Sequence, residues 1–223
     1  MIRGLLFDLD GVIIDSLPSI HASLSHALVT LGYPAIDRDA ARPFIGPPLV
    51  ESARALVGDD PAALERFIAV YRRHYAETSP RATAAMPGAH AVLPALAARW
   101  PLAIASSKPE PFARTILDAL GLAASFRAIC GGALDHHRDT KADVIGRALA
   151  ALAIDPADAP RVALMIGDRR HDVEGARAHG IATIGALQGM GGADELRAAG
   201  ARWLVDDLAG LPALVEALER EGW

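Results

Sequence analysis

Short, continuous apolar runs recur along the chain, and each is bounded by polar or turn-forming residues. A run that is apolar at every position, and not only at alternate positions, is typical of a strand buried on both faces of a parallel sheet. The pattern therefore predicts six buried strands, at Leu5–Leu9, Leu102–Ala105, Phe126–Cys130, Val162–Ile166, Ile181–Leu187 and Trp203–Val205.

Segments with helical periodicity lie between most of these runs. Strands that alternate with helices of this length form right-handed βαβ units. We therefore expect an α/β fold whose core is a doubly wound, Rossmann-like parallel sheet. The predicted helices are His90–Arg99, Pro109–Leu120, Lys141–Leu152, Asp172–His179, Ala193–Ala199 and Leu211–Arg220.

The connection after the first strand is much longer than the others. Residues 16–85 carry helical signals and no convincing strand, whereas a whole βαβ unit takes about 30 residues. The first helix of this connection has Ser16 placed to cap it and an apolar face that includes Ile20 and Leu24. A second helix is expected at about Pro61–Glu77.

The surplus length predicts two parts. We expect residues 16–85 to form an inserted α-helical cap, and residues 1–15 with 86–223 to form the Rossmann-like core. The linkers between them are expected near Asp15–Pro18 and Ala82–Pro87.

Composition narrows the class of protein. Hydrophobic residues make up 52% and charged residues 22% of the 223 positions, which excludes a disordered or collagen-like chain. Acids outnumber bases and the net charge is −5, which argues against general binding to nucleic acid or to an anionic membrane. The single cysteine, Cys130, allows no intrachain disulfide and is expected to be a buried core thiol. Asp8 and Asp10 interrupt the first apolar run too early for a signal peptide, so a cytoplasmic protein is expected.

The first predicted strand ends in two carboxylates and a glycine. Asp8 and Asp10 stand at i and i+2, which places both side chains on the same side of a strand. The carboxyl ends of strands line the ligand crevice of an open α/β sheet, and Gly11 allows a ligand to approach the backbone closely. The simpler alternative is a polar strand terminus followed by a turn.

Further polar groups are expected at the same edge of the sheet. Hydroxyls and lysine suit a phosphate, and clustered carboxylates suit Mg²⁺. Helix caps and a solvated surface charge are the alternatives for these positions. The chain has only two lysines against twenty arginines, and both lysines follow strand ends, which weakens the surface-charge alternative. The residues are Ser106, Ser107 and Lys108 after the second strand, Asp168 and Asp172 after the fourth, and Lys141 at the start of a helix.

Four of these segments, taken in order, resemble the motifs of the haloacid dehalogenase superfamily of phosphohydrolases. They are DLDGVIID at Asp8–Asp15, Ser106, Lys141, and GDRRHD at Gly167–Asp172. The likeness covers nearly the whole chain and points to the branch with a helical cap after the first strand. Phe44–Leu49, which reads FIGPPL, is similar to members called phosphoglycolate-phosphatase-like or 5′-nucleotidase-like.

The resemblance implies a phosphatase mechanism. Asp8 would attack phosphorus and form an aspartyl-phosphate, and Asp10 would protonate the leaving oxygen and then activate water. Asp8, Asp168 and the main-chain carbonyl of Asp10 would hold Mg²⁺, with Asp172 in support. The substrate would be a small phosphorylated metabolite of the phosphoglycolate or 5′-nucleotide type. Substrate contacts are expected from Gly11, Phe44, Gly46, Ser106, Ser107 and Lys141.

Several points depart from the family pattern or stay open. Val12 follows Gly11 where many family phosphatases have threonine, and valine is also seen in the phosphomutase-like branch. Arg169 stands where serine or threonine is commoner, and it would either restrict the site or pair with Asp172. A sugar phosphomutase of the beta-phosphoglucomutase type and a non-catalytic phosphate-binding protein remain alternatives. Residues 16–85 offer His21 and His26 but no lysine to a phosphomutase.

We also make a prediction for each of two loops. The loop from Phe44 to Pro48 is the best candidate in the cap for contact with the leaving group, although Phe44 would alternatively pack inside the cap. His136 and His137 are expected in a solvated loop, because no further ligand stands at a metal-binding spacing from them.

Overall fold

The computed structural model describes residues 1–134 and 139–223, which form two compact units. One unit comprises Met1–Ile14 with Ala85–Trp223, and the other comprises Asp15–Ala84. The sequence places both boundaries one residue later. The expectation that His136 and His137 occupy a solvated loop falls outside the described residues.

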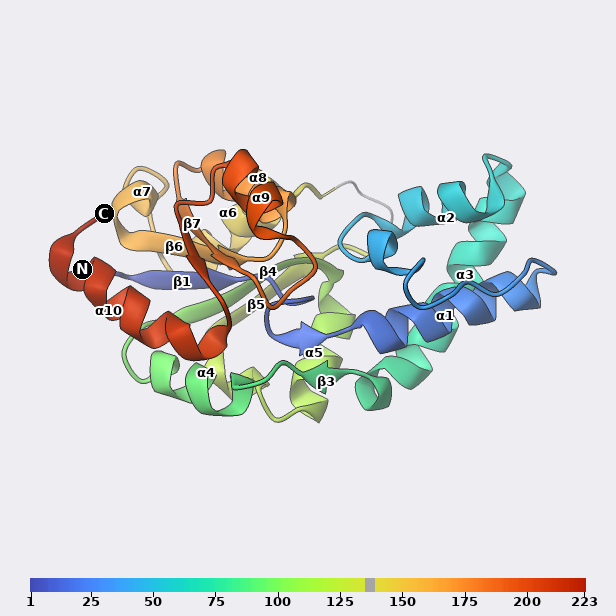
Figure 1. The fold of residues 1–223 in the computed structure, drawn as a ribbon, viewed down its shortest axis with the longest axis horizontal. Helices are drawn as coiled ribbons and strands as arrows, with labels where there is room; N and C mark the ends of the chain where they lie inside the picture. The colour runs from blue at the N-terminus through green and yellow to red at the C-terminus, as the bar shows by residue number, and fades with distance from the viewer. Residues whose placement is uncertain (135–138) are drawn as a thin grey trace. The chain divides into compact units, whose positions relative to one another are not determined.

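A six-stranded parallel sheet forms the centre of the first unit (Figure 1). Its strands are β1 Gly4–Phe7, β4 Leu102–Pro109, β5 Ala128–Gly132, β6 Ala163–Gly167, β7 Ala182–Ala186 and β8 Trp203–Val205. Their order in the sheet is β5-β4-β1-β6-β7-β8. The chain therefore builds outward from β1 on one side and then returns to build on the other. This order confirms the predicted doubly wound sheet and makes the carboxyl end of β1 the switch point at which such sheets bind ligands.

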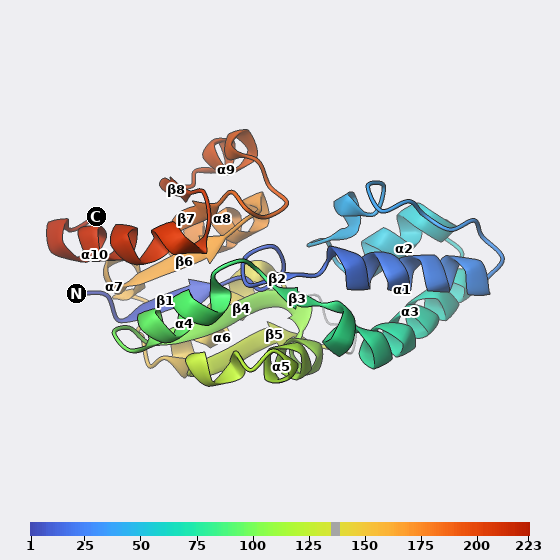
Figure 2. The same cartoon turned by 60° about the horizontal axis from the view of Figure 1, so that its bottom comes forward.

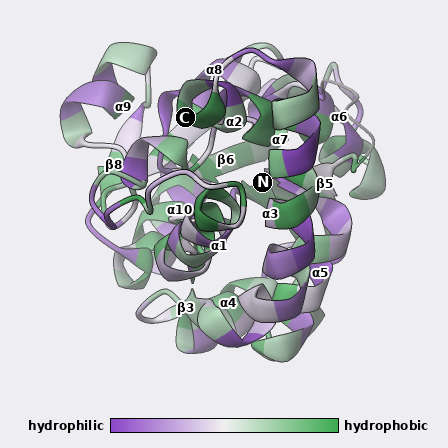
Figure 3. Ribbon diagram, turned by 90° about the vertical axis from the view of Figure 1, so that its right-hand side faces the viewer, coloured by the Kyte–Doolittle hydropathy of each residue, from purple (hydrophilic) through white to green (hydrophobic). Residues whose placement is uncertain are grey.

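Helices cover both faces of this sheet. Figure 1 shows α6 Lys141–Ala151 and α8 Arg170–Arg177 on one face, and α4 Ala89–Ala97, α5 Glu110–Ala119 and α10 Leu211–Glu221 on the other. Leu6 and Met165 pack with Val144 and Ile145 of α6 in the core beneath the first face. In Figure 3 strand β6 is green, as expected of a strand buried on both faces. The remaining short elements of this unit are η2 Ala123–Ser125, α7 Ala159–Val162, α9 Ala193–Ala199 and η3 Leu208–Gly210.

The second unit is helical (Figure 2). Helices α1 Leu17–Thr30 and α3 Pro61–Ala82 pack together, and α2 Leu49–Val57 packs on α3. The short helix η1 spans Arg42–Phe44. Two-residue strands, β2 Ile14–Asp15 and β3 Ala84–Ala85, pair where the chain passes between the units.

Several local expectations are wrong. Strand β1 ends at Phe7, and β4 continues to Pro109 with a shift in register after Ala105. The hydroxyl of Ser16 makes no cap hydrogen bond, and the N–H of Leu17 donates to Oδ1 of Asp15 at 3.1 Å. Cys130 is half-buried at the margin of the core, and not fully buried.

Within the described residues, no helix is long and apolar enough to cross a membrane.

Candidate active site

Lys141 joins two carboxylates, those of Asp8 after β1 and of Asp172 in the first turn of α8. Its Nζ lies 2.7 Å from Oδ1 of Asp8 and 2.7 Å from Oδ1 of Asp172. Helix α6 begins at Lys141 because Thr140 and Asp143 form a reciprocal capping box. Asp8 follows β1 directly, and its N–H donates to the carbonyl of Ile166 on β6 at 2.9 Å. Lys141 is buried, so the surface-charge alternative is wrong.

Asp172 serves both as a helix cap and as a partner of Lys141. Its Oδ2 accepts hydrogen bonds from the main-chain N–H groups of Asp168 and Arg169, both at 3.1 Å, while Oδ1 pairs with Lys141. Burial raises the pKa of Asp172 to about 6, against the lowering effect of the Lys141 charge. Burial also disfavours the Lys141 cation, but the charges of Asp172 and Asp8 outweigh it and raise the pKa of Lys141.

Asp168 has a buried carboxylate oxygen without a hydrogen-bond partner among the described residues. Its side chain is 1% exposed, and its Oδ2 accepts from the N–H of Met190 at 2.6 Å. The unpartnered atom is Oδ1. Burial, and then the charges of Asp172 and Asp8, raise the pKa of Asp168 well above its usual range. Burying an ionised carboxylate with one unpartnered oxygen costs free energy unless a cation lies beside it.

Three carboxylates are close enough to share one cation. Asp8, Asp168 and Asp172 each offer an oxygen, and these oxygens lie within 4.8 Å of one another. Hard oxygen donors of this kind suit Mg²⁺, and the unpartnered oxygen of Asp168 fits a ligand position. The donor set therefore fits the metal that the sequence predicts.

Asp10 lies beside a different lysine. Nζ of Lys108 is 3.0 Å from Oδ1 of Asp10, and the two side chains are 6% and 12% exposed. The expectation that Asp8 and Asp10 project from one strand is wrong, because β1 ends at Phe7 and Asp10 forms only an isolated bridge to Ile14. The Asp10 side chain is not one of the three clustered carboxylates. The main-chain carbonyl of Asp10 therefore remains its predicted metal ligand.

The formal charges in this region do not cancel. With all four carboxylates ionised, the two ammonium groups leave a net charge of −2. One divalent cation would bring this sum to zero, and a dianionic phosphate would otherwise meet repulsion.

Gly11 and Ser106 approach the same groups from neighbouring segments. Gly11 has φ +81°, and a Cβ there would lie 2.3 Å from Oδ2 of Asp168. Glycine is therefore needed where the turn after β1 meets this carboxylate. Ser106 is buried, and its Oγ accepts from the N–H of Lys108 at 3.3 Å, which leaves the hydroxyl hydrogen to donate to a ligand. Ser107 is exposed.

The predicted cap residues belong to the Asp15–Ala84 unit and are described within it. Phe44 ends the short helix η1 and is half-buried, whereas the neighbouring Ile45 is buried. Gly46 is exposed and has φ +101°. His21 pairs with the carbonyl of Ile36, 2.8 Å from its Nε2.

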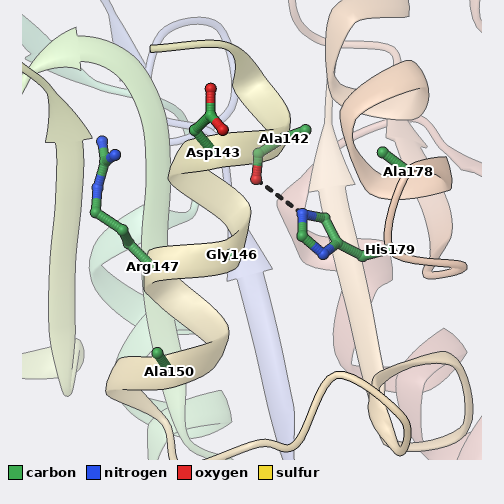
Figure 4. A pocket seen from close by; sticks show the side chains of 7 residues that line it. All are labelled: Ala142, Asp143, Gly146, Arg147, Ala150, Ala178 and His179. Carbon is green, nitrogen blue, oxygen red and sulfur yellow. Dashed lines mark hydrogen bonds between the residues drawn. The ribbon is translucent and has the colours of Figure 1, made fainter.

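A separate depression lies beside α6 (Figure 4). His179 reaches across it, and its Nε2 lies 2.8 Å from the carbonyl of Ala142. None of the site carboxylates lines this depression, and its lining offers neither a metal cluster nor a nucleophile. Its lining residues are Ala142, Asp143, Gly146, Arg147, Ala150, Ala178 and His179.

The sequence places Lys108 at the edge of the sheet, on the scarcity of lysine, but predicts no partner for it and leaves Arg169 open. The side chain of Arg169 pairs with Glu195, at 3.0 Å from its Nε, and its main-chain N–H donates to Oδ2 of Asp172 at 3.1 Å. No local signal links Arg169 to Glu195, because they stand 26 positions apart.

A family model, two curated relatives and a solved structure point to the same protein family. Residues 5–186 match the model of the family described as haloacid dehalogenase-like hydrolase. A 5′-nucleotidase of Pseudomonas aeruginosa is 36% identical over 215 residues, which is 96% of each chain. A phosphoglycolate phosphatase of Pseudomonas putida is 32% identical and is covered over 78% of its length. The crystal structure of a predicted phosphatase from Clostridium acetobutylicum superposes with a TM-score of 0.89 at 33% identity, over 98% of this chain and all of that one.

Another relative has a name that states a different activity. Tyrosine-protein kinase PtkA of Mycobacterium tuberculosis is 40% identical over 190 residues. The match takes in 85% of this chain, and the chain spans 63% of the length of that relative.

Proposed function

This chain belongs to the haloacid dehalogenase-like hydrolases, and we propose that it is a Mg²⁺-dependent phosphatase that acts through an aspartyl-phosphate. Its substrate is a small phosphorylated metabolite of the 5′-nucleotide or phosphoglycolate type. The observation that carries the proposal is the position of Asp8, whose carboxylate lies beside Lys141 and within the three-carboxylate cluster.

Asp8 is the nucleophile in this proposal. One carboxylate oxygen attacks phosphorus, and the bond from phosphorus to the leaving oxygen breaks. Lys141 holds the Asp8 carboxylate in place at 2.7 Å, and its raised pKa keeps it cationic, so that it also attracts the phosphoryl oxygens. Ser106 donates its free hydroxyl hydrogen to the phosphoryl group, and the exposed Ser107 and the Gly11 turn complete the cradle.

Asp10 moves the protons. It gives a proton to the leaving oxygen in the first step, and takes one from the water that hydrolyses the aspartyl-phosphate in the second. Lys108 holds the Asp10 carboxylate away from the cluster, at 3.0 Å from Oδ1. The two carboxylates of the DLD sequence are therefore held apart by two different lysines, one for each role.

Asp8, Asp168 and the main-chain carbonyl of Asp10 would hold Mg²⁺, and Asp172 would support it through its caps on the Asp168 and Arg169 N–H groups. Bound there, Mg²⁺ supplies positive charge against the phosphoryl oxygens and removes the repulsion among the carboxylates.

The Asp15–Ala84 unit acts as the cap in this proposal and selects the leaving group. The core residues account for the contacts of the phosphoryl group, so selection falls to residues outside them. The names of the two phosphatase relatives support a nucleoside or a small carboxylic acid as the leaving group.

Hydrolysis of p-nitrophenyl phosphate tests the reaction. We expect turnover with Mg²⁺, none with EDTA, and none from Asp8→Asn, whose circular dichroism should match the wild type. Beryllium trifluoride should bind the wild type alone, because only a carboxylate at position 8 can coordinate it. Steady turnover by Asp8→Asn would overturn the nucleophile. Adenosine 5′-monophosphate and phosphoglycolate, compared by kcat/KM, separate the two substrate types.

A protein tyrosine kinase is the second candidate, favoured by the 40% identity to PtkA. A kinase would pass the phosphoryl group of ATP to a tyrosine hydroxyl instead of water. Incubation with [γ-³²P]ATP and a tyrosine-containing peptide distinguishes the two: labelled peptide supports the kinase, whereas unlabelled peptide from a preparation that hydrolyses p-nitrophenyl phosphate supports the phosphatase. A sugar phosphomutase would be seen as isomerisation of β-glucose 1-phosphate.

A further inference from the structure

The segment from Gln188 to Gly192 lies directly against the Asp168 carboxylate. A Cβ on Gly189 would lie 2.3 Å from Oδ2 of Asp168, and a Cβ on Gly191 would lie 2.0 Å from its main-chain oxygen. Any side chain at either position would push the segment away. The glycines therefore allow the N–H of Met190, between them, to reach Oδ2 at 2.6 Å.

This contact decides which oxygen of Asp168 is free. Because Oδ2 is held by the N–H of Met190, Oδ1 is the atom left without a partner among the described residues. A carboxylate anchored through one oxygen presents the other in a fixed direction, which favours a cation of strict geometry such as Mg²⁺.

Both ends of the segment are tethered to the core. At one end, the side-chain amide of Gln188 donates to the carbonyl of Val12 at 2.9 Å and accepts from the N–H of Leu208 at 3.3 Å. At the other end, Oε1 of Glu195 accepts from Nε of Arg169 at 3.0 Å and from the N–H of Arg170 at 2.9 Å.

The tether at Glu195 is partly buried and charge-assisted. The side chains of Arg169 and Glu195 are 20% and 30% exposed, so solvent screens their attraction only in part. Arg169 immediately follows Asp168 in the chain. Asp168 supplies the carboxylate, and Arg169 contacts Glu195, just beyond the segment whose Met190 N–H orients that carboxylate.

We propose that Arg169 is a positioning residue for cation binding: through Glu195, it holds residues 188–192 against Asp168 and so presents Oδ1 of Asp168 to the metal. This inference rests on the metal site of the proposed function. It gives a structural reason for an arginine beside a site that binds a cation, where simple electrostatics would disfavour one.

The sign of the effect separates positioning from through-space charge. Removing a positive charge near a cation site should strengthen Mg²⁺ binding if charge alone acts. Removing it should weaken Mg²⁺ binding if Arg169 acts by holding the segment. Arg170 is the matched control, because it is adjacent, carries the same charge, and pairs with Glu174 on the surface of α8.

The experiment is calorimetric titration of Mg²⁺ into the full chain without substrate, for the wild type, Arg169→Met, Glu195→Gln and Arg170→Met. We expect the dissociation constant to rise about tenfold in Arg169→Met and Glu195→Gln, and to stay equal or fall in Arg170→Met. The Mg²⁺ dissociation constant of the double variant Arg169→Met/Glu195→Gln should not exceed that of the single variant that binds Mg²⁺ more weakly. Both substitutions weaken the same contact between Arg169 and Glu195, so their effects should not add.

Kinetics give a second measurement. The Mg²⁺ concentration for half-maximal phosphatase rate should rise in Arg169→Met, while kcat at saturating Mg²⁺ stays near the wild-type value. If Arg169→Met does not fold, Arg169→Gln, which also removes the positive charge and the reach to Glu195, carries the test with Arg170→Gln beside it. Equal or tighter Mg²⁺ binding by Arg169→Met, or unchanged binding by Glu195→Gln, would overturn the inference. Absence of Mg²⁺ binding by the wild type would instead overturn the metal site of the proposed function.

Discussion

The ammonium group of Lys108 lies 3.0 Å from Oδ1 of Asp10, and both side chains are almost completely buried. Lys108 is near the end of β4, and Asp10 is in the turn after β1, the neighbouring strand of the sheet. The pair thus ties the segment that carries the Asp8 and Asp10 carboxylates to the adjacent strand. Asp8 and Asp10 are only two residues apart, yet each has its own lysine.

Replacing Lys108 by methionine tests this pair. The change leaves the Asp10 carboxylate without its cation, which should lower the free energy of unfolding by roughly 1–3 kcal/mol. Without Lys108 the Asp10 carboxylate should no longer be held in one position, so we expect kcat to fall on the order of tenfold or more. Denaturant unfolding and steady-state kinetics provide the two measurements. Adding Asp10→Asn to Lys108→Met should restore stability but not activity, and a further loss of stability would contradict the pairing.

The buried carboxylates predict how Mg²⁺ stabilisation depends on pH. The raised pKa of Asp172, about 6, means that the folded state keeps this proton to a higher pH than the unfolded chain. Without metal, the contribution of Asp172 to stability is therefore lost as the pH rises from about 4 to about 6. Mg²⁺ needs the ionised carboxylates, so its effect on the melting temperature should be small at pH 5 and larger at pH 7.5.

Thermal unfolding with and without Mg²⁺ at the two pH values checks this expectation. Asp168→Asn is the control, since it removes a charged member of the cluster and should abolish most of the shift at pH 7.5. An equal shift at pH 5 and pH 7.5 in the wild type would count against cation binding by these carboxylates.

Phe44 should affect the leaving group more than the phosphoryl group. It is half-buried in the proposed cap, two residues before the positive-φ Gly46, and has aromatic surface to offer a nucleoside. We expect Phe44→Ala to lower kcat/KM about tenfold for a 5′-nucleotide and much less for acetyl phosphate, whose leaving group is small.

The control is Tyr33→Ala, which removes another partly exposed aromatic side chain of the same unit. Circular dichroism should show that both variants fold. Equal losses of kcat/KM on the two substrates in Phe44→Ala would show that this residue does not select the leaving group.

Gly131 should resist substitution for a steric reason. A Cβ there would lie 2.5 Å from the main-chain N and Cα of Glu110 and from the carbonyl oxygen of Lys108. Backbone atoms at the start of α5 cannot yield cheaply, so Gly131→Ala should cost about 1–3 kcal/mol in the free energy of unfolding. Gly192→Ala, where a Cβ would meet nothing within 4 Å, should change stability little. Similar denaturant midpoints for the two variants would contradict the close approach.

Much of the fold follows from local patterns. The apolar run at Leu102–Ala105 predicts a strand because burial on both faces requires apolar side chains at every position. Helix α6 begins at Lys141 because Thr140 and Asp143 cap it, and those residues are neighbours in the chain. The acidic and basic residues at the strand ends could likewise be found without coordinates, because parallel strands all end at one edge of the sheet.

The pairing of those residues was decided only by the tertiary structure. The sequence by itself determined a doubly wound sheet, an inserted helical segment and a phosphatase-like set of carboxylates and lysines. It did not determine that Lys108 faces Asp10, that Lys141 joins Asp8 to Asp172, or that Arg169 turns to Glu195. Each of these contacts depends on which strands are neighbours and where each strand ends, and both are set by packing among residues far apart in the chain. Strand β1 ends two residues before the predicted Leu9, and the two aspartates of one short motif lie beside different lysines.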